Sequence, residues 1–154
     1  MALGYEDINT PIIIGCDHAA YALKKVIVDF LKDIFLEVED VGTHGPASVN
    51  YADFGKMVAS AVSAGKNQRG ILICGTGLGM SMVANRYPGV RAALCSESFS
   101  AKMSRLHNDS NILVMGARVI GEALAVDLVK TWLETPFEGG RHLDRLKTMD
   151  SIGC

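Results

Sequence analysis

The sequence lacks a hydrophobic run long enough to cross a membrane. Its longest stretch without a charged side chain, residues 70–85, contains four glycines and is shorter than the ~20 apolar residues of a spanning helix. Residues 1–10 carry two acids, no basic residue and no apolar segment, so they lack the features of a secretory signal. We therefore expect no membrane partner.

Charge of either sign is also scarce. Only 21% of the 154 residues are charged, and 15 basic against 17 acidic side chains give a net charge of −2. Nucleic-acid binding driven by positive charge is therefore not expected. Hydrophobic residues make up 49%, which predicts a sheet covered on both faces, a subunit interface, or both. The length predicts a single domain spanning residues 1–154.

Closely spaced cysteines are absent as well. Cys16, Cys74, Cys95 and Cys154 lack the spacing of a zinc site, and a chain of this length needs no disulfide framework. We expect them to be small buried thiols in a reducing, cytoplasmic environment.

What the sequence does contain is a regular alternation of short apolar runs and helical patterns. Apolar runs at residues 11–16, 35–41, 70–74, 90–95 and 111–115 predict five buried strands. Segments 19–31, 51–64, 78–86, 98–106 and 121–133 predict the intervening helices. This alternation predicts an α/β fold, a doubly wound (Rossmann-like) five-stranded parallel sheet in three α/β/α layers.

The two ends of the chain depart from this alternation. Residues 1–10 look like a structureless extension. After Pro136 and a pair of glycines, residues 141–149 predict a short C-terminal helix that is too polar for the core. We expect the segment 137–154 to lie across the body or to reach a neighbouring subunit.

Polar residues gather around the ends of the predicted strands. Ligands of open parallel sheets bind outside the carboxyl ends of the strands. The residues concerned are Asp17 and His18 after the first strand, Cys74 to Gly79 after the third, Arg118 after the fifth, and His107 and Asn108 just ahead of the fifth. We expect this concentration to form the functional site.

A glycine-rich loop follows the third strand and opens a helix. The backbone can approach a ligand closely at Gly75, Gly77 and Gly79, and the amides at the start of a helix attract negative charge, so the loop could bind an anion. The alternative interpretation is a plain strand-to-helix turn that binds no ligand. A dinucleotide fingerprint needs a glycine at the position of Met80, which argues against it, although Glu97 is placed as dinucleotide binding requires. A cysteine phosphatase loop needs an arginine at the same position, so that motif is not matched. A P-loop is excluded, because no Gly-Lys-Ser/Thr follows.

Four side chains could move protons. Cys74 begins the glycine loop, where amides and the helix dipole would lower the pKa of its thiol, so it is a candidate base or nucleophile. Asp17 and His18 could pair a carboxylate with an imidazole, or could simply cap and flank a helix. His107 is equally ambiguous, because a histidine is favourable at a helix end on dipole grounds alone.

Two arginines could hold an anion. Arg141 and Arg145 are four residues apart on the C-terminal helix and therefore share a face. A guanidinium pair suits a phosphate group, although such a pair can equally be a solvated surface.

These motifs together resemble the type B ribose-5-phosphate isomerases, a group that includes allose- and galactose-6-phosphate isomerases. The resemblance runs from about residue 12 to residue 149. It is carried by GCDH at 15–18, VNY at 49–51, GILICGTGLGMS at 70–81, GVRAALC at 89–95, SRLHND at 104–109, GAR at 116–118 and GGRH at 139–142. It implies that ribose 5-phosphate is converted to ribulose 5-phosphate through an enediolate, without a metal or an organic cofactor.

The resemblance also implies roles for individual residues. Cys74 would be the base that moves a proton between C2 and C1, since Met80, where some members have a carboxylate, cannot take a proton. The remaining roles would be oxyanion binding by the amides of Gly75, Gly77 and Gly79 and by Asn108; ring opening and hydroxyl binding by Asp17, Thr76 and His107; phosphate binding by His18, Arg118, Arg141 and Arg145; and a substrate contact by Tyr51. The site would form in a homodimer, with the C-terminal arginines supplied by the partner; pairing of dimers into tetramers stays open.

Two departures and two rival functions accompany this interpretation. Asn50 and Ala52 replace the aspartate and proline common in the family, just beside Tyr51. A hexose-6-phosphate isomerase would need the same base and phosphate contacts and differ in cleft length. A non-catalytic module that binds a nucleotide or sugar phosphate could use the same fold, but would not require Cys74, His107 and Asp17 together.

Overall fold

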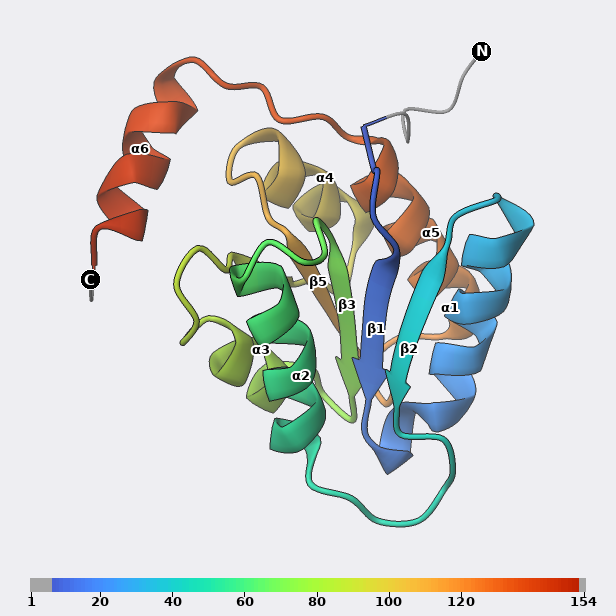
Figure 1. The fold of residues 1–154 in the computed structure, drawn as a ribbon. Coiled ribbons are helices and arrows are strands. Elements are labelled where there is room, and N and C mark those ends of the chain that lie inside the picture. The colour runs from blue at the N-terminus through green and yellow to red at the C-terminus, as the bar shows by residue number, and fades with distance from the viewer. Residues whose placement is uncertain (1–6, 153–154) are drawn as a thin grey trace.

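Five parallel strands form the centre of the molecule. The computed structural model describes residues 7–152. Its strands are β1 (Ile12–Cys16), β2 (Val38–Gly42), β3 (Gly70–Cys74), β4 (Ala92–Leu94) and β5 (Ile112–Gly116). They lie in the order β2-β1-β3-β5-β4, and each neighbouring pair is parallel. The predicted five-stranded parallel sheet is confirmed (Figure 1).

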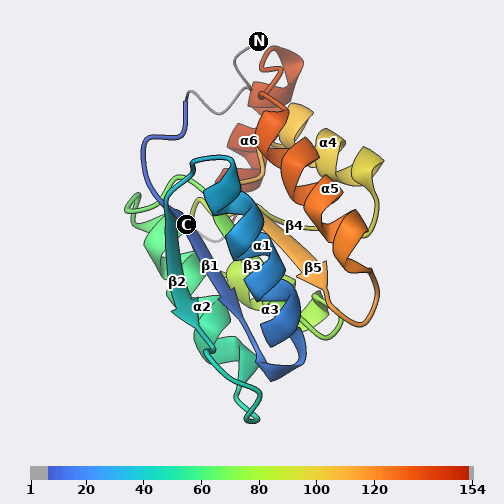
Figure 2. The same cartoon turned by 90° about the vertical axis from the view of Figure 1, so that its right-hand side faces the viewer.

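Helices cover both faces of this sheet. They are the short 3-10 helix η1 (His18–Ala20) and the α-helices α1 (Tyr21–Asp33), α2 (Tyr51–Ser63), α3 (Leu78–Ala84), α4 (Ser98–Leu106), α5 (Glu122–Glu134) and α6 (Arg141–Asp150). α1, α4 and α5 cover one face, and α2 and α3 the other, which confirms the three predicted layers (Figure 2). No helix within residues 7–152 is long and apolar enough to span a bilayer.

The three central strands are apolar on both faces because helices cover both. Every residue of β1, β3 and β5 is buried. Along β1, Ile12 and Ile14 belong to the hydrophobic cluster that includes α1 and α5, whereas Ile13 belongs to the cluster with α2. Burying one such side chain contributes about 1.5–3 kcal/mol to the stability of the folded state, so these strands hold the residues at their ends in fixed positions.

The edge strands correct the prediction that all five strands are buried. β2 and β4 each have one neighbour and are only partly buried. The predicted strand 35–41 also begins three residues too early. Phe35 is exposed with a φ of +63°, and its N–H donates to the carbonyl of Lys32, so it ends α1 instead of starting β2. Other boundaries differ from prediction by no more than two residues.

The described part of the N-terminal extension is attached to the body. The N–H of Asn9 donates to the side-chain oxygen of Gln68 at 2.7 Å, and the N–H of Gln68 donates to the hydroxyl of Thr10 at 2.9 Å. Ile8 packs against the core cluster. The expectation of a structureless extension is therefore wrong for residues 7–10, which are held by these contacts although they form neither helix nor strand. Residues 1–6 lie outside the described part.

The C-terminal helix α6 stands away from the layered body and is docked by few side chains (Figure 1). Its buried residues are His142 and Leu146. The ring of His142 stacks on that of His107 at the end of α4, with centroids 4.4 Å apart and planes inclined by 14°. Glu138 Oε2 lies 3.5 Å from His142 Nε2.

The surroundings of His142 favour its neutral imidazole. Burial lowers the pKa of His142 below the ordinary 6.5, and His107 lowers it further. Arg141 and Arg145 act in the same direction, while Glu138 opposes them. The pKa of His142 is lower in the folded than in the unfolded chain. The contribution of neutral His142 to the stability of the folded state is therefore complete above pH 6.5 and is lost as the pH falls through the lowered pKa.

We therefore expect acid to loosen α6. Hydrogen–deuterium exchange of residues 138–150, corrected for the intrinsic pH dependence of exchange, should be faster well below pH 6.5 than well above it. In a His142→Asn variant, which lacks the titrating ring, this acid-induced increase should be smaller. Equal protection at both pH values in the unaltered protein would contradict the argument.

Candidate active site

A cavity opens at the carboxyl edge of the sheet. β1 is followed by α1 on one face and β3 by α3 on the other, so a crevice forms between the ends of these neighbouring strands. The cavity has a volume of about 300 Å³ and is lined by Asp17, His18, Ala19, Tyr51, Cys74, Gly75, Thr76, Gly79 and Arg118. All of these except Ala19 are predicted site residues.

Cys74 ends β3 at the base of the glycine loop. Its side chain is buried, and the N–H of Gly77 donates to its sulfur at 3.1 Å. Gly77 can direct its N–H in this way because it adopts a φ of +80°, a conformation that favours glycine. An N–H donated to sulfur stabilises negative charge there, which is what a thiolate base needs.

The other described cysteines are in surroundings that suppress reactivity. Cys16 and Cys95 are buried free thiols, and burial raises the pKa of each to about 11. The expectation of buried thiols is confirmed for these two and for Cys74; Cys154 lies outside the described residues.

The glycine loop lies close against its neighbours, and two glycines make this possible. A Cβ atom on Gly116, at the end of β5, would come within 2.6 Å of the Thr76 carbonyl oxygen. A Cβ on Gly79 would come within 2.5 Å of the Tyr51 ring. Beyond the strands, the N–H of Arg118 donates to the carbonyl of Gly75 at 2.9 Å, which continues the attachment of the loop to β5.

The loop amides only partly match the predicted oxyanion-binding set. The N–H of Gly77 is used by the Cys74 sulfur, and the N–H of Leu78 donates to the Thr76 hydroxyl at 3.3 Å. The Thr76 hydroxyl therefore accepts the first N–H of α3, and the residue also lines the cavity. Gly75 and Gly79 line the cavity, whereas Gly77 faces the sulfur.

Asp17 and His18 take both of the roles considered for them. The Asp17 carboxylate accepts the N–H of Ala19 at 3.0 Å, which makes it the N-cap of η1, and the residue also lines the cavity. The Nδ1 atom of His18 accepts the backbone N–H of Val49 at 3.2 Å. An accepting Nδ1 carries a lone pair, so this hydrogen bond assigns the ring proton of His18 to Nε2.

Tyr51 is positioned by the cap of α2. Asn50 precedes it and accepts the N–H of Ala52 at 3.0 Å, as the N-cap of the helix. Asparagine and aspartate are equivalent in this role, so the departure at Asn50 leaves the start of α2 intact. Val49 belongs to the VNY motif at 49–51, but its side chain does not predict its contribution, which is a hydrogen bond from its backbone N–H to His18.

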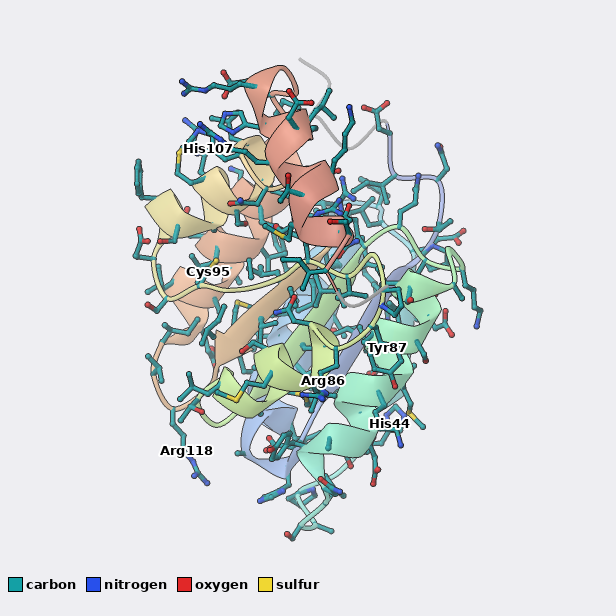
Figure 3. The ribbon with its side chains drawn as sticks, turned by 90° about the vertical axis from the view of Figure 1, so that its left-hand side faces the viewer. His44, Arg86, Tyr87, Cys95, His107 and Arg118 are labelled. Carbon is teal, nitrogen blue, oxygen red and sulfur yellow. The ribbon has the colours of Figure 1, made fainter. Side chains whose placement is uncertain are left out.

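The remaining predicted residues lie at the opposite edge of the sheet, which corrects the expectation of a single concentration. His107 and Asn108 precede β5, so they lie at its amino end, and Figure 3 shows His107 and Arg118 at opposite ends of the molecule. Arg141 and Arg145 lie on α6, which docks beside His107. One chain therefore does not bring these four residues to Cys74.

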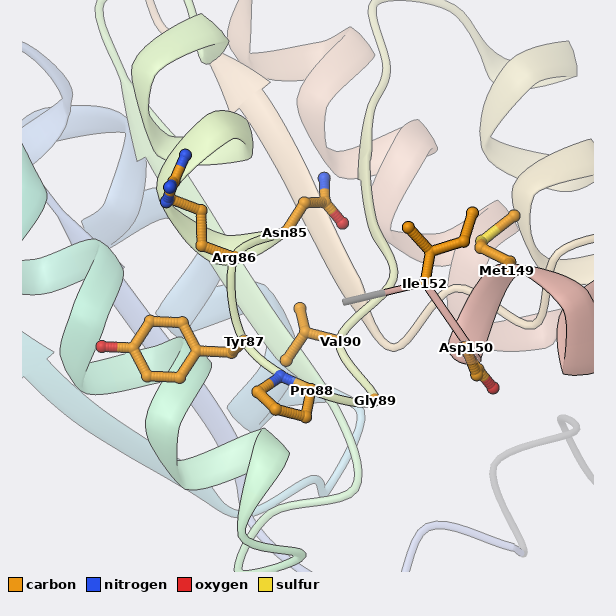
Figure 4. A pocket seen from close by; sticks show the side chains of 9 residues that line it. All are labelled: Asn85, Arg86, Tyr87, Pro88, Gly89, Val90, Met149, Asp150 and Ile152. Atoms are coloured by element: carbon orange, nitrogen blue, oxygen red, sulfur yellow. The ribbon is translucent and has the colours of Figure 1, made fainter. Parts of the chain in front are cut away.

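A larger cavity of about 440 Å³ lies between α6 and the segment after α3 (Figure 4). It is lined by Asn85, Arg86, Tyr87, Pro88, Gly89, Val90, Met149, Asp150 and Ile152. It holds neither a histidine nor a cysteine and includes no predicted site residue, so its chemistry is poorer than that of the cavity at Cys74.

One group of side chains in residues 7–152 has ligand atoms close enough to hold a metal ion. These atoms of His107, Glu138 and His142 all lie within 4.8 Å of one another. Imidazole and carboxylate ligands suit zinc. The positive charges of Arg141 and Arg145 and the negative charge of Glu138 act on His142 in opposite directions, so charges of both signs surround this group.

Comparison with known proteins places the chain in a family of sugar phosphate isomerases. The family model described as Ribose/Galactose Isomerase matches residues 12–149. Ribose-5-phosphate isomerase B of Escherichia coli is 45% identical over 141 residues, which are 92% of this chain and 95% of that protein. The D-erythrulose-4-phosphate isomerase of Pectobacterium atrosepticum is 45% identical over 131 residues, 84% of this chain and 86% of that protein.

Solved structures show the same fold. Ribose-5-phosphate isomerase B of Clostridium thermocellum superimposes with a TM-score of 0.91 at 55% identity, covering 93% of this chain and 97% of that one. With the family model matching nearly the whole sheet-and-helix body, this chain belongs to the ribose/galactose isomerase family.

Proposed function

We propose that this protein interconverts ribose 5-phosphate and ribulose 5-phosphate, with Cys74 as the base. One observation carries the proposal: a buried thiol, with an N–H group donating to its sulfur, lines a cavity that also contains Asp17, His18 and Arg118. Relatives named ribose-5-phosphate isomerase B align over most of the chain and support this substrate.

The reaction moves one proton between adjacent carbons, C2 and C1, and a second between the oxygens that these carbons carry. The thiolate of Cys74 would take the proton from C2, and the electrons of that bond would form the C1–C2 double bond while the carbonyl electrons move to the oxygen on C1. The proton then returns to C1 while the hydroxyl proton on the C2 oxygen is passed to the oxygen on C1, so that the C2 oxygen becomes a carbonyl and the ketose forms. Donors held near the developing oxyanion, such as the amides of Gly75 and Gly79, would lower the barrier.

The other groups would prepare and hold the sugar. Asp17 and Thr76 are suited to handle the ring hydroxyls during ring opening, which also needs an acid or base of the kind His107 offers. His18, with its proton on Nε2, and Arg118 can donate to phosphate oxygens. Tyr51 would contact the sugar from the start of α2.

We further propose that a complete site forms only in a homodimer. His107, Asn108, Arg141 and Arg145 lie at the edge of the sheet opposite Cys74, so a second copy of the chain would have to supply them. Leu78 and Met82 on one face of α3 are large exposed apolar side chains beside the glycine loop, and they support an interface there. The free thiols support a reducing, cytoplasmic location.

Substrate length is the property that separates the rivals. Allose or galactose 6-phosphate would need the same base and phosphate contacts, and D-erythrulose 4-phosphate is named for the relative from Pectobacterium atrosepticum. A cavity of about 300 Å³ in one chain suits a small sugar phosphate in general, and the second copy would set its length.

The first test compares substrates and removes the base. Purified protein should isomerise ribose 5-phosphate faster than allose 6-phosphate, galactose 6-phosphate or D-erythrulose 4-phosphate. Cys74→Ala should lower kcat by about 10²–10⁴-fold, as expected for loss of a proton-transfer group, while binding of ribose 5-phosphate remains measurable by calorimetry. Cys95→Ala, a buried thiol outside the cavity, is the matched control. Near-normal kcat in Cys74→Ala would rule out this base.

The second test concerns the phosphate. Replacing both Arg141 and Arg145 by Ala should raise KM about 10- to 100-fold with little change in kcat, since their contacts would be made equally in the ground state and the transition state. Lys147→Ala, which removes an exposed positive charge from the same helix, should leave KM unchanged. An unchanged KM in the double arginine variant would mean that the phosphate binds elsewhere.

A further inference from the structure

One arginine connects two segments that the proposed function places in the same site. Arg91 lies just ahead of β4 at the amino edge of the sheet, and its side chain is only 16% exposed. Its Nε donates to the carbonyl of Asn108 at 2.9 Å and to that of Asp109 at 3.3 Å, and its Nη2 lies 3.3 Å from the Asp109 carboxylate. Its Nη1 donates to both carboxylate oxygens of Asp150, at 3.2 and 3.1 Å.

The first of these segments is a turn that needs support. Asp109 has a φ of +44°, a conformation that is uncommon for residues other than glycine. Arg105, which is almost fully buried, donates to the Asp109 carboxylate at 2.7 Å and to the Ser110 carbonyl at 2.6 Å. Arg91 donates to the backbone carbonyls of the same turn, those of Asn108 and Asp109. Two guanidinium groups therefore hold the backbone that carries His107 and Asn108.

The second segment is the end of α6. Its first turns dock through His142 and Leu146, whereas its last turn faces the cavity of about 440 Å³ lined by the segment 85–90 and by Met149, Asp150 and Ile152 (Figure 4). The helix therefore does not pack tightly against the body there. Arg91 reaches past this gap to Asp150 and forms a polar bridge from the sheet edge to this end of α6.

We infer that Arg91 is a positioning residue that fixes the spacing between the turn at His107–Asn108 and the phosphate-binding face of α6. The inference rests on the proposed function, in which both segments contact one substrate molecule at once. A substrate that is held by Arg141 and Arg145 while it reacts near His107 requires these groups at a fixed separation, and small misplacements of reacting groups are costly to the rate. The stacked rings of His107 and His142 join the two segments at the start of α6, and the guanidinium of Arg91 joins them at its end, so that together they set the separation.

The two arms of Arg91 can be cut separately. Asp150→Ala removes the α6 arm and leaves the contacts of Arg91 with Asn108 and Asp109 in place. It should raise KM for ribose 5-phosphate about five-fold with kcat nearly unchanged, the size expected for a partly exposed ion pair. Arg91→Gln removes both arms and should also lower kcat, by about 10- to 100-fold. Asp144→Ala, an exposed carboxylate on the same helix that pairs only with Lys147 among the described ion pairs, is the matched control and should behave as the unaltered protein.

A double-mutant cycle supplies the decisive readout. Because Asp150 is expected to act through Arg91, adding Asp150→Ala to Arg91→Gln should raise KM no further. Fully additive effects on KM, or an Asp150→Ala variant indistinguishable from Asp144→Ala, would overturn the inference. If Arg91→Gln fails to fold by circular dichroism, Arg91→Lys takes its place in the cycle. It keeps one positive charge but not the guanidinium fork, and it should lower kcat; an unchanged kcat would also overturn the inference.

Failure of this inference can be told apart from failure of the proposed function. If the unaltered protein isomerises none of the four sugar phosphates, the proposed function is wrong. If it isomerises ribose 5-phosphate but Asp150→Ala and Arg91→Gln leave both constants unchanged, only the positioning role of Arg91 is wrong.

Discussion

A parallel sheet brings the carboxyl ends of all its strands to one edge and their amino ends to the other, and the positions of the proposed site residues next to the strands follow from this constraint. Burial on both faces holds β1, β3 and β5 in register, so the segments after them converge on one cavity. The same constraint sends the turn before β5 to the far edge, with His107 and Asn108 on it. Side-chain motion cannot close a separation of this kind, whereas a second copy of the chain can.

The two edges hold irregular backbone in place by different means. At the carboxyl edge, small residues and backbone hydrogen bonds do so: Gly116 admits the loop at Thr76, and the N–H of Ala117 donates to the Cys74 carbonyl at 2.8 Å. At the amino edge, the charged side chains of Arg91 and Arg105 surround the turn at Asp109. The first arrangement leaves an open cavity for a ligand, and the second presents a rigid turn that another chain can receive.

Much of this arrangement is predictable from the sequence because it follows from local patterns. Aliphatic runs indicate β1, β3 and β5, and a polar or glycine residue directly after such a run indicates the ligand edge, as at Cys74. Sequence patterns fail where the determinant is an interaction between distant segments. Phe35 extends an apolar run but lies in the turn that ends α1. The amino-edge position of His107, in contrast, follows from its place ahead of β5, and the expectation of a single site at the carboxyl edge was wrong because it ignored this order. The hydrogen bond from Val49 to His18 is donated by a backbone N–H, so the residue types do not predict it.

The central claim, that each active site is built from the carboxyl edge of one chain and the amino edge of another, is tested most directly by mixing two inactive variants. Cys74→Ala and His107→Ala, each folded by circular dichroism, would be co-refolded with different affinity tags so that heterodimers can be isolated and counted. In a random mixture half the dimers are mixed, and each of these has one intact site, so activity should return to about a quarter of the unaltered level. Isolated heterodimers with no activity above that of either parent would contradict the claim.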